Sequence, residues 1–280
     1  MSQVDLHIHT TASDGKFTPP EIVRKSVQAG LKYIGITDHD SIDGVIPACR
    51  EAETLTGITV IGGVEINTDI PAGELHILGY LVDPDNRELV TTLEKLRISR
   101  IDRARRMVEK LQKLGVSIEY DRVKKLAGVG SVGRPHIAEA MLEKGYITSF
   151  KEAFIKYIGR EGPAYVERDK ITPEEAVQLV LRSRGTPVLA HPLTCENPEK
   201  IIIGLKSAGL KGLEIYYGNY SPEQIRELRK LAKKYDLLST GGSDFHGLDA
   251  AVEPSLGMVE VPLECAELLV QFHMETYGRA

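Results

Sequence analysis

The sequence is poor in cysteine and lacks long apolar runs, and each absence narrows the class of protein. The three cysteines, Cys49, Cys195 and Cys265, lie far apart and form no Cys-x-x-Cys pair. This spacing argues against a disulfide framework or a structural zinc ribbon and favours a reducing compartment. No apolar run approaches the roughly 20 residues of a membrane span, and no basic-then-apolar leader precedes the first predicted strand. We therefore expect a cytoplasmic protein without a membrane segment.

An excess of charge of one sign is also lacking. The 280 residues have a formal net charge of −5, so no global basic field indicates a nucleic-acid partner. With 42% hydrophobic residues, the chain is long enough to bury the core of one large barrel or of two ordinary domains.

What the chain does contain is a series of histidines and carboxylates at the ends of predicted strands. In Val4-Asp-Leu-His-Ile-His9, His7 and His9 share one face, because residues i and i+2 of a strand point the same way. A lone His-x-His would also fit two surface histidines on an edge strand. Later strands end in the same manner, however, and together they predict a polynuclear metal site. Its candidate ligands are His7, His9, Asp14, His39, Glu65, His76, His191, Asp244 and His246.

Some of these positions have a simpler alternative explanation. His76 lies inside its predicted strand and would also fit a core histidine, and Asp14 precedes a glycine in a plain turn signal. Asp38 and Asp40 flank His39. They are either partners that orient the imidazoles or carboxylates at the start of a helix.

Strands alternate with helices along most of the chain, at the spacing of a parallel sheet. About seven strands with helices outside predict an α/β fold, a distorted (β/α)7 barrel of TIM-like type, whose site lies at the carboxyl ends of the strands. The alternation stops between residues 86 and 168, where apolar residues from Leu93 to Leu114 follow helical spacing. We expect the barrel over 1–85 and 169–280, with an inserted helical substrate-binding subdomain over 86–168.

The types of candidate ligand limit which metal ions the site can bind. Imidazole mixed with carboxylate suits manganese, iron or zinc, whereas calcium and magnesium prefer oxygen ligands alone. Nine candidates exceed the needs of one ion, since a catalytic zinc takes about three protein ligands and a water. We expect two or three divalent ions, with Glu65 and Asp244 as the bridging carboxylates. Two ions roughly 3.5–4 Å apart acidify a water and stabilise an in-line phosphoryl displacement.

The order of the motifs resembles one family. His-x-His, Asp14, Thr37-Asp-His-Asp40, Gly63-Val-Glu65, Leu75-His76, Ala190-His-Pro192 and Gly242-Ser-Asp-Phe-His246 are similar to the polymerase and histidinol phosphatase (PHP) superfamily. The resemblance implies a trinuclear centre. One metal would take His7, His9, Glu65 and Asp244, a second Glu65, His76 and His191, and a third Asp14, His39 and His246.

Two further segments, Ser131-Val-Gly-Arg-Pro-His-Ile-Ala138 and Gly212-Leu-Glu-Ile-Tyr-Tyr-Gly218, resemble one bacterial branch of that superfamily. Its enzymes remove the 3′-phosphate from nucleoside 3′,5′-bisphosphates and trim the 5′ ends of short RNAs. The substrate's phosphate would then bind Ser131, Arg134, His136 and Arg160. Arg134 offers a planar guanidinium suited to phosphate, although it could instead form a salt bridge near a helix start.

We therefore expect a metal-dependent phosphoesterase that acts on a small phosphorylated nucleotide, or on the end of a short single-stranded RNA, with no obligate protein partner. Glu65, His191 and Asp244 are the expected catalytic residues. His191 or His246 is a candidate for protonating the leaving oxygen, but a histidine that holds a metal is not free to do so, and the general acid stays open.

Three alternatives remain. The first is an amidohydrolase-type C–N hydrolase, although no lysine ends a strand. The others are a different PHP phosphomonoesterase, such as a histidinol-phosphate phosphatase, and a non-catalytic PHP module. The basic run Arg97, Arg100, Arg103, Arg105 and Arg106 fits a solvated helix face, with an RNA track as the alternative.

Overall fold

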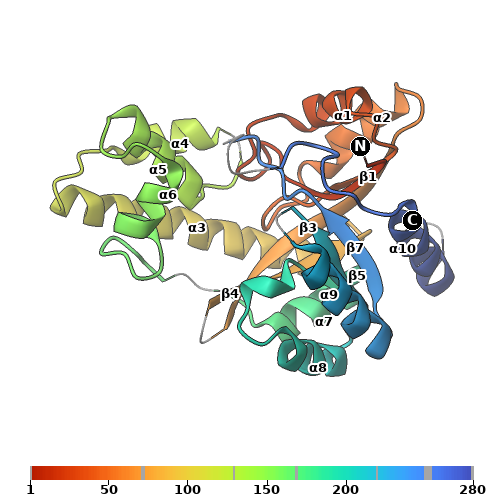
Figure 1. Cartoon of the computed structure of the whole chain (residues 1–280). Coiled ribbons are helices and arrows are strands. Elements are labelled where there is room, and N and C mark those ends of the chain that lie inside the picture. The colour runs from red at the N-terminus through yellow and green to blue at the C-terminus, as the bar shows by residue number, and fades with distance from the viewer. Residues whose placement is uncertain are drawn as a thin grey trace.

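The computed structural model describes residues 2–70, 73–128, 130–167, 170–218, 220–248 and 254–278. Within this part of the chain, seven strands form one sheet in sequence order, and a parallel bridge between Ile8 and Phe245 brings the last strand back beside the first. The result is the nearly closed barrel that the sequence predicts (Figure 1). The strands are β1 (Val4–Ile8), β2 (Tyr33–Ile36), β3 (Thr59–Ile70), β4 (Gly73–Tyr80), β5 (Thr186–Leu189), β6 (Gly212–Tyr217) and β7 (Leu238–Gly242).

Helices cover the outside of the barrel. Two of them begin after a threonine, because Thr18 and Thr172 form capping boxes with a glutamate three residues later. The helices around the barrel are α1 (Pro19–Gln28), α2 (Val45–Glu53), α7 (Pro173–Arg182), α8 (Pro198–Ala208), α9 (Pro222–Lys234) and α10 (Leu263–Tyr277).

The residues between β4 and α7 form the helical insertion, as residues 86–168 are called below. Its long helix α3 runs away from the barrel, and the shorter helices gather over its far half (Figure 1). The first turns of α3 pack with the barrel core through Leu89, Leu93 and Leu96, whereas Met107 and Leu111 belong to a separate apolar cluster. The helices are α3 (Arg87–Lys113), α4 (Tyr120–Ala127), α5 (Arg134–Glu143), α6 (Phe150–Ala153) and the π-helix η1 (Phe154–Ile158).

The prediction of an all-parallel sheet is wrong at one strand. β4 runs antiparallel to both β3 and β5. Only two residues separate it from β3 in the sequence, and neighbouring strands joined by so few residues must be antiparallel, since a parallel pair needs a crossover of a dozen or more. β3 is also longer than predicted, so that Glu65 lies within it rather than at its end. The reversed strand explains why His76 lies inside β4: it pairs with Asn67, two residues beyond Glu65.

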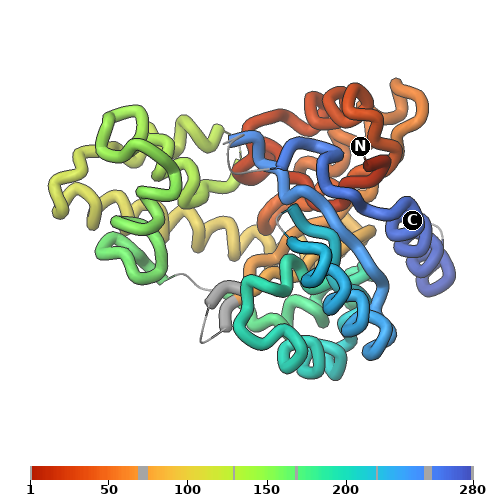
Figure 2. Tube along the Cα trace, in the orientation of Figure 1, coloured from red at the N-terminus to blue at the C-terminus, as the bar shows by residue number. Residues whose placement is uncertain are grey.

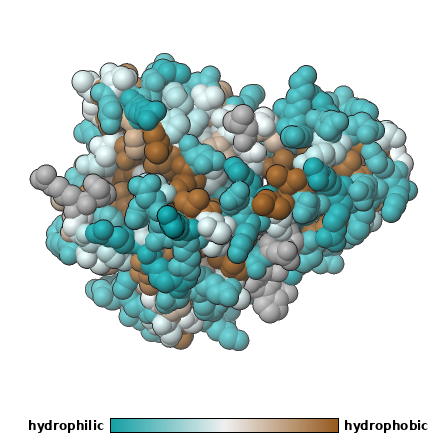
Figure 3. Space-filling view, turned by 180° about the vertical axis from the view of Figure 1, so that it is seen from behind, coloured by the Kyte–Doolittle hydropathy of each residue, from teal (hydrophilic) through white to brown (hydrophobic). Residues whose placement is uncertain are grey.

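The chain path brings both ends of the sequence to the same part of the barrel. The blue segment that contains β7 runs beside the red segment that contains β1 (Figure 2), and His9 donates its backbone N–H to the Phe245 carbonyl at 3.0 Å. Seen from behind, the surface is mostly hydrophilic with separate hydrophobic patches (Figure 3). Among the helices of the described residues, none is long and apolar enough to cross a membrane.

Candidate metal centre

The carboxyl ends of β1, β2, β5 and β7 bring most of the predicted ligands together, and the middles of β3 and β4 provide the other two. Because the strands converge at this end of the barrel, side chains more than 200 residues apart in sequence come into contact. All nine predicted ligands lie in this one cluster, which we call the metal centre: His7, His9, Asp14, His39, Glu65, His76, His191, Asp244 and His246.

Two groups of ligands share Glu65. In the first group, His9 Nε2 lies 3.3 Å from Glu65 Oε2 and 3.0 Å from Asp244 Oδ1. His7 Nε2 lies 3.5 Å from Glu65 Oε1 and 3.3 Å from the same Asp244 oxygen. In the second group, Glu65 Oε1 lies 2.8 Å from His76 Nδ1 and 3.1 Å from His191 Nε2. Glu65 therefore joins the two groups, as expected of a bridging carboxylate.

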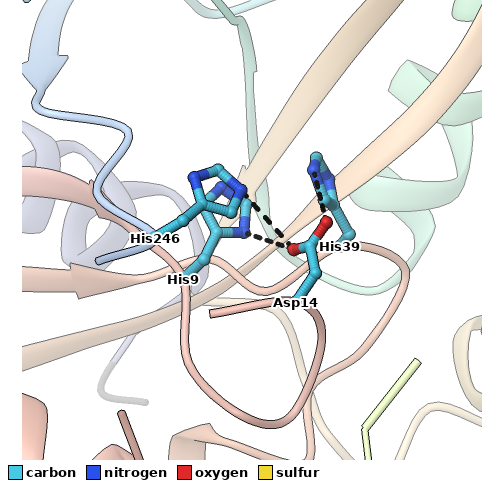
Figure 4. Close-up of side chains that lie close together, drawn as sticks. All are labelled: His9, Asp14, His39 and His246. Carbon is cyan, nitrogen blue, oxygen red and sulfur yellow. Dashed lines mark ion pairs between the residues drawn. The ribbon is translucent and has the colours of Figure 1, made fainter. Parts of the chain in front are cut away.

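The third group surrounds Asp14. One Asp14 oxygen lies 3.5 Å from His246 Nε2 and 4.0 Å from His9 Nδ1, and the other lies 4.0 Å from His39 Nε2 (Figure 4). These are the members that the resemblance implies, with His9 added. The His39 ring also approaches Glu65, with Nδ1 2.7 Å from Oε2, so the three groups are contiguous.

The metal centre contains buried polar atoms that lie close to one another as ion pairs but form no hydrogen bond with the described residues. A buried donor or acceptor without a hydrogen bond costs about 1–3 kcal/mol, and an apolar environment raises the cost for charged groups. Cations held between these nitrogen and oxygen donors would satisfy them, and the mixed donor set fits manganese, iron or zinc. The atoms are His7 Nε2, both ring nitrogens of His9, Asp14 Oδ1, His39 Nδ1, Glu65 Oε2 and Asp244 Oδ1.

The electrostatics of the metal centre act differently on different ligands. Burial lowers the pKa values of His7, His9 and His191, but the neighbouring carboxylates raise them above the usual range, so metal binding at these histidines displaces protons. Burial by itself would raise the pKa of Glu65, but the surrounding histidines hold it well below its usual range. The pKa of Asp244 is lowered in the same way. Burial lowers the pKa of His39 to about 4. At neutral pH the two carboxylates are ionised and this imidazole keeps a lone pair, which are the forms that coordinate a cation.

Asp38 holds the loop that carries Asp14. Its buried carboxylate accepts hydrogen bonds from Thr10 N at 2.7 Å, Thr10 Oγ1 at 2.8 Å and Ser13 Oγ at 2.6 Å. These bonds fix a loop without regular structure next to the metal centre. Asp38 is thus an anchor of the Asp14 loop rather than a carboxylate at a helix start.

Asp40 joins the barrel to the helical insertion. It accepts a hydrogen bond from Arg100 Nε at 2.7 Å and one from the Asn67 backbone N–H at 3.0 Å. Arg100 also donates to the Asn67 side-chain oxygen, and the Asn67 amide nitrogen lies 2.6 Å from His76 Nε2. A chain of polar contacts therefore runs from α3 to a predicted metal ligand.

The expectation of a solvated basic face on α3 is wrong for two of its arginines. Arg100 and Arg103 are each only 8% exposed, because Arg100 contacts the barrel through Asp40 and Arg103 packs against the segment that contains Val166. Arg103 donates to the Val166 carbonyl at 2.8 Å, and its guanidinium lies 5.1 Å from the centre of the Tyr165 ring. Arg97, one turn earlier, is half-exposed and pairs with Asp43, as a solvated face requires.

Two further residues at the metal centre were not predicted. Glu214, in the middle of β6, is fully buried and contacts His7 and the His191 backbone. Tyr217 donates its hydroxyl to Asp244 Oδ2 at 2.9 Å. The sequence did contain a signal for Glu214, which is a charged residue inside the apolar run Gly212-Leu-Glu-Ile. Because a glutamate is rarely fully buried unless it is paired, its place in a buried strand predicts a polar partner.

A cavity opens between the metal centre and the helical insertion. Asp14, His39, His76 and His246 line one side of it, and residues of α3, α5 and η1 line the other. Of the four residues expected to bind phosphate, Arg134 lines this cavity, with its guanidinium 5.3 Å from the centre of the Phe154 ring.

The other three residues expected to bind phosphate lie outside the cavity lining. Ser131 is buried, and no described residue makes a hydrogen bond to its hydroxyl. His136 is buried, and its Nδ1 accepts the Gly133 backbone N–H at 3.0 Å. Arg160 is exposed after η1. Arg134 is therefore the member of this set that is placed to contact a ligand in the cavity.

The segment before α5 packs closely against the Asp14 loop. A Cβ atom on Gly130 would lie 2.3 Å from the Thr11 carbonyl oxygen and 2.6 Å from that of Ser13. Glycine is therefore required where the helical insertion meets this loop.

Residues 5–146 match the family model described as the PHP domain. The chain belongs to the PHP domain family. This match includes the first six ligands of the metal centre, from His7 to His76, together with most of the helical insertion.

Similarity to relatives extends this PHP assignment over most of the chain. A 5′-3′ exoribonuclease of Haemophilus influenzae is 33% identical over 246 residues, which are 86% of this chain and 89% of that protein. A 3′,5′-nucleoside bisphosphate phosphatase of Chromobacterium violaceum is 29% identical over 251 residues, which are 88% of each chain.

Two solved structures share the PHP fold of this chain. A Bifidobacterium adolescentis protein described as a metal-dependent phosphoesterase has a TM-score of 0.88 and 28% identity over 96% of both chains. A protein described as an amidohydrolase from Chromobacterium violaceum, with bound sulfate, has a TM-score of 0.84 and 28% identity over 95% of this chain and 96% of that one. The family and the barrel fold expected from the sequence are confirmed, and a metal-dependent hydrolase of phosphoric esters is the enzyme class that the comparisons support.

Proposed function

We propose that this protein hydrolyses the 3′-phosphate of nucleoside 3′,5′-bisphosphates with the help of bound divalent metal ions. The main supporting observation is the cavity that Arg134 lines together with Asp14, His39 and His246. A guanidinium donates two parallel hydrogen bonds to phosphate, so one phosphate binds Arg134 while the other lies at the metal centre. The name of the Chromobacterium violaceum phosphatase agrees with this substrate.

The proposed roles of the side chains follow from their contacts. When bound, divalent ions acidify a coordinated water and neutralise charge on the phosphoryl oxygens. Glu65 and Asp244 balance the positive charge, and His191 completes the second group beside Glu65. Tyr217 holds Asp244 by its hydroxyl. Arg134 orients the substrate's phosphate. The substrate is therefore already positioned when it binds, and less entropy is lost in reaching the transition state.

We assign substrate binding to the helical insertion, because the cavity wall opposite the metal centre comes from it. Arg103 and Arg134 give that wall its positive charge, and Phe154 gives it an aromatic surface. The spacing of the cysteines favours a reducing compartment, and we place the enzyme in the cytoplasm.

A second candidate activity is the 5′-to-3′ trimming of short single-stranded RNA. The observation that favours it is the 33% identity to the Haemophilus influenzae exoribonuclease over most of both chains. Both activities would use the same metal centre, because each hydrolyses a phosphoric ester of a nucleotide.

One assay separates the candidates. Protein loaded separately with manganese, iron or zinc is given a nucleoside 3′,5′-bisphosphate, 5′-phosphorylated RNA oligonucleotides, a phosphomonoester panel that includes histidinol phosphate, and a cyclic amide panel. Phosphate, mononucleotides and ammonia are measured. We expect phosphate from the bisphosphate at a higher kcat/KM than from any other monoester.

The control is the Asp244→Asn variant purified in the same way, which should lose the activity if it belongs to this protein. Mononucleotide release at a higher kcat/KM than phosphate release would make RNA trimming the main activity. Ammonia from the amides without phosphate from any ester would refute the proposal and favour the amidohydrolase class.

A further inference from the structure

Glu214 connects two strands of the barrel at the metal centre. Its side chain is fully buried on β6, with Oε1 2.9 Å from His7 Nδ1. Its other oxygen, Oε2, accepts the backbone N–H of His191 at 2.6 Å. We propose that Glu214 is a positioning residue that sets the coordinating nitrogen of His7 and the backbone of His191. This inference rests on the metal centre of the proposed function.

The first contact determines which nitrogen of His7 is available for a metal. A carboxylate oxygen accepts hydrogen bonds, so in the neutral His7 that metal coordination requires, the Nδ1 that faces Glu214 carries the hydrogen. The lone pair is then on Nε2, which points toward Glu65 and Asp244 at 3.5 and 3.3 Å. A hydrogen bond of this kind fixes the tautomer and the ring orientation of metal-binding histidines in general.

The second contact holds an unusual backbone conformation. His191 has φ +25° and ψ +59°, in the left-handed region that costs a residue with a side chain about 1–3 kcal/mol. Its N–H is anchored by Glu214, and this conformation directs the ring toward the second group, with Nε2 3.1 Å from His76 Nδ1. One carboxylate therefore serves ligands that come from β1 and β5.

A glutamine at this position would have the same shape but one acceptor instead of two. The His191 backbone N–H is a fixed donor, so the amide oxygen of Glu214→Gln must accept it. The amide NH2 then faces His7 Nδ1, and two donors cannot hydrogen-bond to each other. His7 must move the hydrogen to Nε2 or turn away, and either change removes its lone pair from the first group.

Asp38 provides a matched comparison in the same site. It is also a fully buried carboxylate, but its partners are Thr10 and Ser13 in the Asp14 loop. The Asp38→Asn substitution therefore tests the loss of a buried acceptor that supports the third group. It leaves the contacts of Glu214 intact, and the tautomer of His7 should not change.

The test is nitrogen NMR on protein with 15N-labelled histidine, loaded with diamagnetic zinc, with the His7 signals assigned from their loss in His7→Asn. In the unmodified chain we expect zinc on His7 Nε2 and hydrogen on Nδ1. Glu214→Gln should lose this pattern and bind zinc about 10–100-fold more weakly in competition with a chelator, the range typical of such partners. Asp38→Asn should keep the His7 pattern.

Several results would overturn the inference. One is zinc on His7 Nδ1 in the unmodified chain, or no zinc binding at all, and neither depends on whether a variant folds. Another is a Glu214→Gln protein, folded by circular dichroism, with unchanged His7 signals and zinc affinity. If zinc binds through His7 Nε2 in the unmodified chain but no ester is hydrolysed, the proposed function fails while this inference stands.

Discussion

The buried contact between α3 and the barrel gives the most quantitative prediction. Arg100→Met keeps much of the side-chain volume but removes the guanidinium, and leaves Asp40 as a buried carboxylate that has lost this partner. Asp40 is 1% exposed, so water does not replace the lost hydrogen bond. Breaking a buried pair by removing one partner costs about 3–5 kcal/mol.

That loss is measurable as a change in melting temperature. For a protein of 280 residues, the entropy of unfolding is about 0.6 kcal/mol per degree at about 2.1 cal/mol/K per residue. A loss of about 3–5 kcal/mol then lowers Tm by about 5–8 °C. Scanning calorimetry of the two proteins in the same buffer and with the same metal content gives the comparison.

The control is Arg97→Met, which makes the same substitution one turn earlier on the same helix. Arg97 pairs with Asp43 at 3.4 Å, with both side chains substantially exposed to solvent, and an exposed pair contributes about 0–1 kcal/mol. We expect a change of Tm below about 2 °C for it. A fall in Tm for Arg100→Met that is no larger than the fall for Arg97→Met would refute the assignment of Arg100 to a buried network.

Three other substitutions test the site. His9→Ala should lose about one metal ion per chain along with most of the activity, because His9 belongs to two ligand groups; elemental analysis showing an unchanged ratio would contradict this. Arg134→Ala should raise KM for the bisphosphate about 10–100-fold with metal content unchanged, since a charged hydrogen bond to phosphate contributes about 1.5–3 kcal/mol; loss of metal would assign Arg134 to the metal centre instead. Tyr217→Phe should lower kcat about tenfold by releasing Asp244, with Tm within about 2 °C of the unmodified protein, and an unchanged kcat would remove Tyr217 from the site.

The ligands of the metal centre were predictable because strand order alone brings them together. His7, His191 and Asp244 each lie at or just beyond the carboxyl end of a predicted strand, and in a barrel those ends meet. The direction of β4 was missed, because the pattern of apolar residues in a strand is the same in either direction. His76 reaches the centre from inside that reversed strand.

The polar contacts around the ligands were harder to predict, because they depend on which side of an element meets the site. The sequence does contain a signal for Arg100 and Arg103. They continue the apolar stripe of Leu93 and Leu96 at helical spacing, and an arginine within such a stripe is buried and paired. Which partners it would meet depends on the crossing of α3 over the barrel, which no local pattern specifies.

The attachment of the helical insertion at Arg100 and Gly130 has a consequence for how ligands are recognised. An outward swing of the helices would separate the Arg100 guanidinium from Asp40 and would pull Gly130 off the loop backbone that it touches. The cavity between the metal centre and the helical insertion is thus preorganised, so ligand binding requires little free energy for a conformational change. Selectivity then follows a lock-and-key principle, and rigid analogues with two anionic groups at a fixed separation should make better inhibitors than flexible ones.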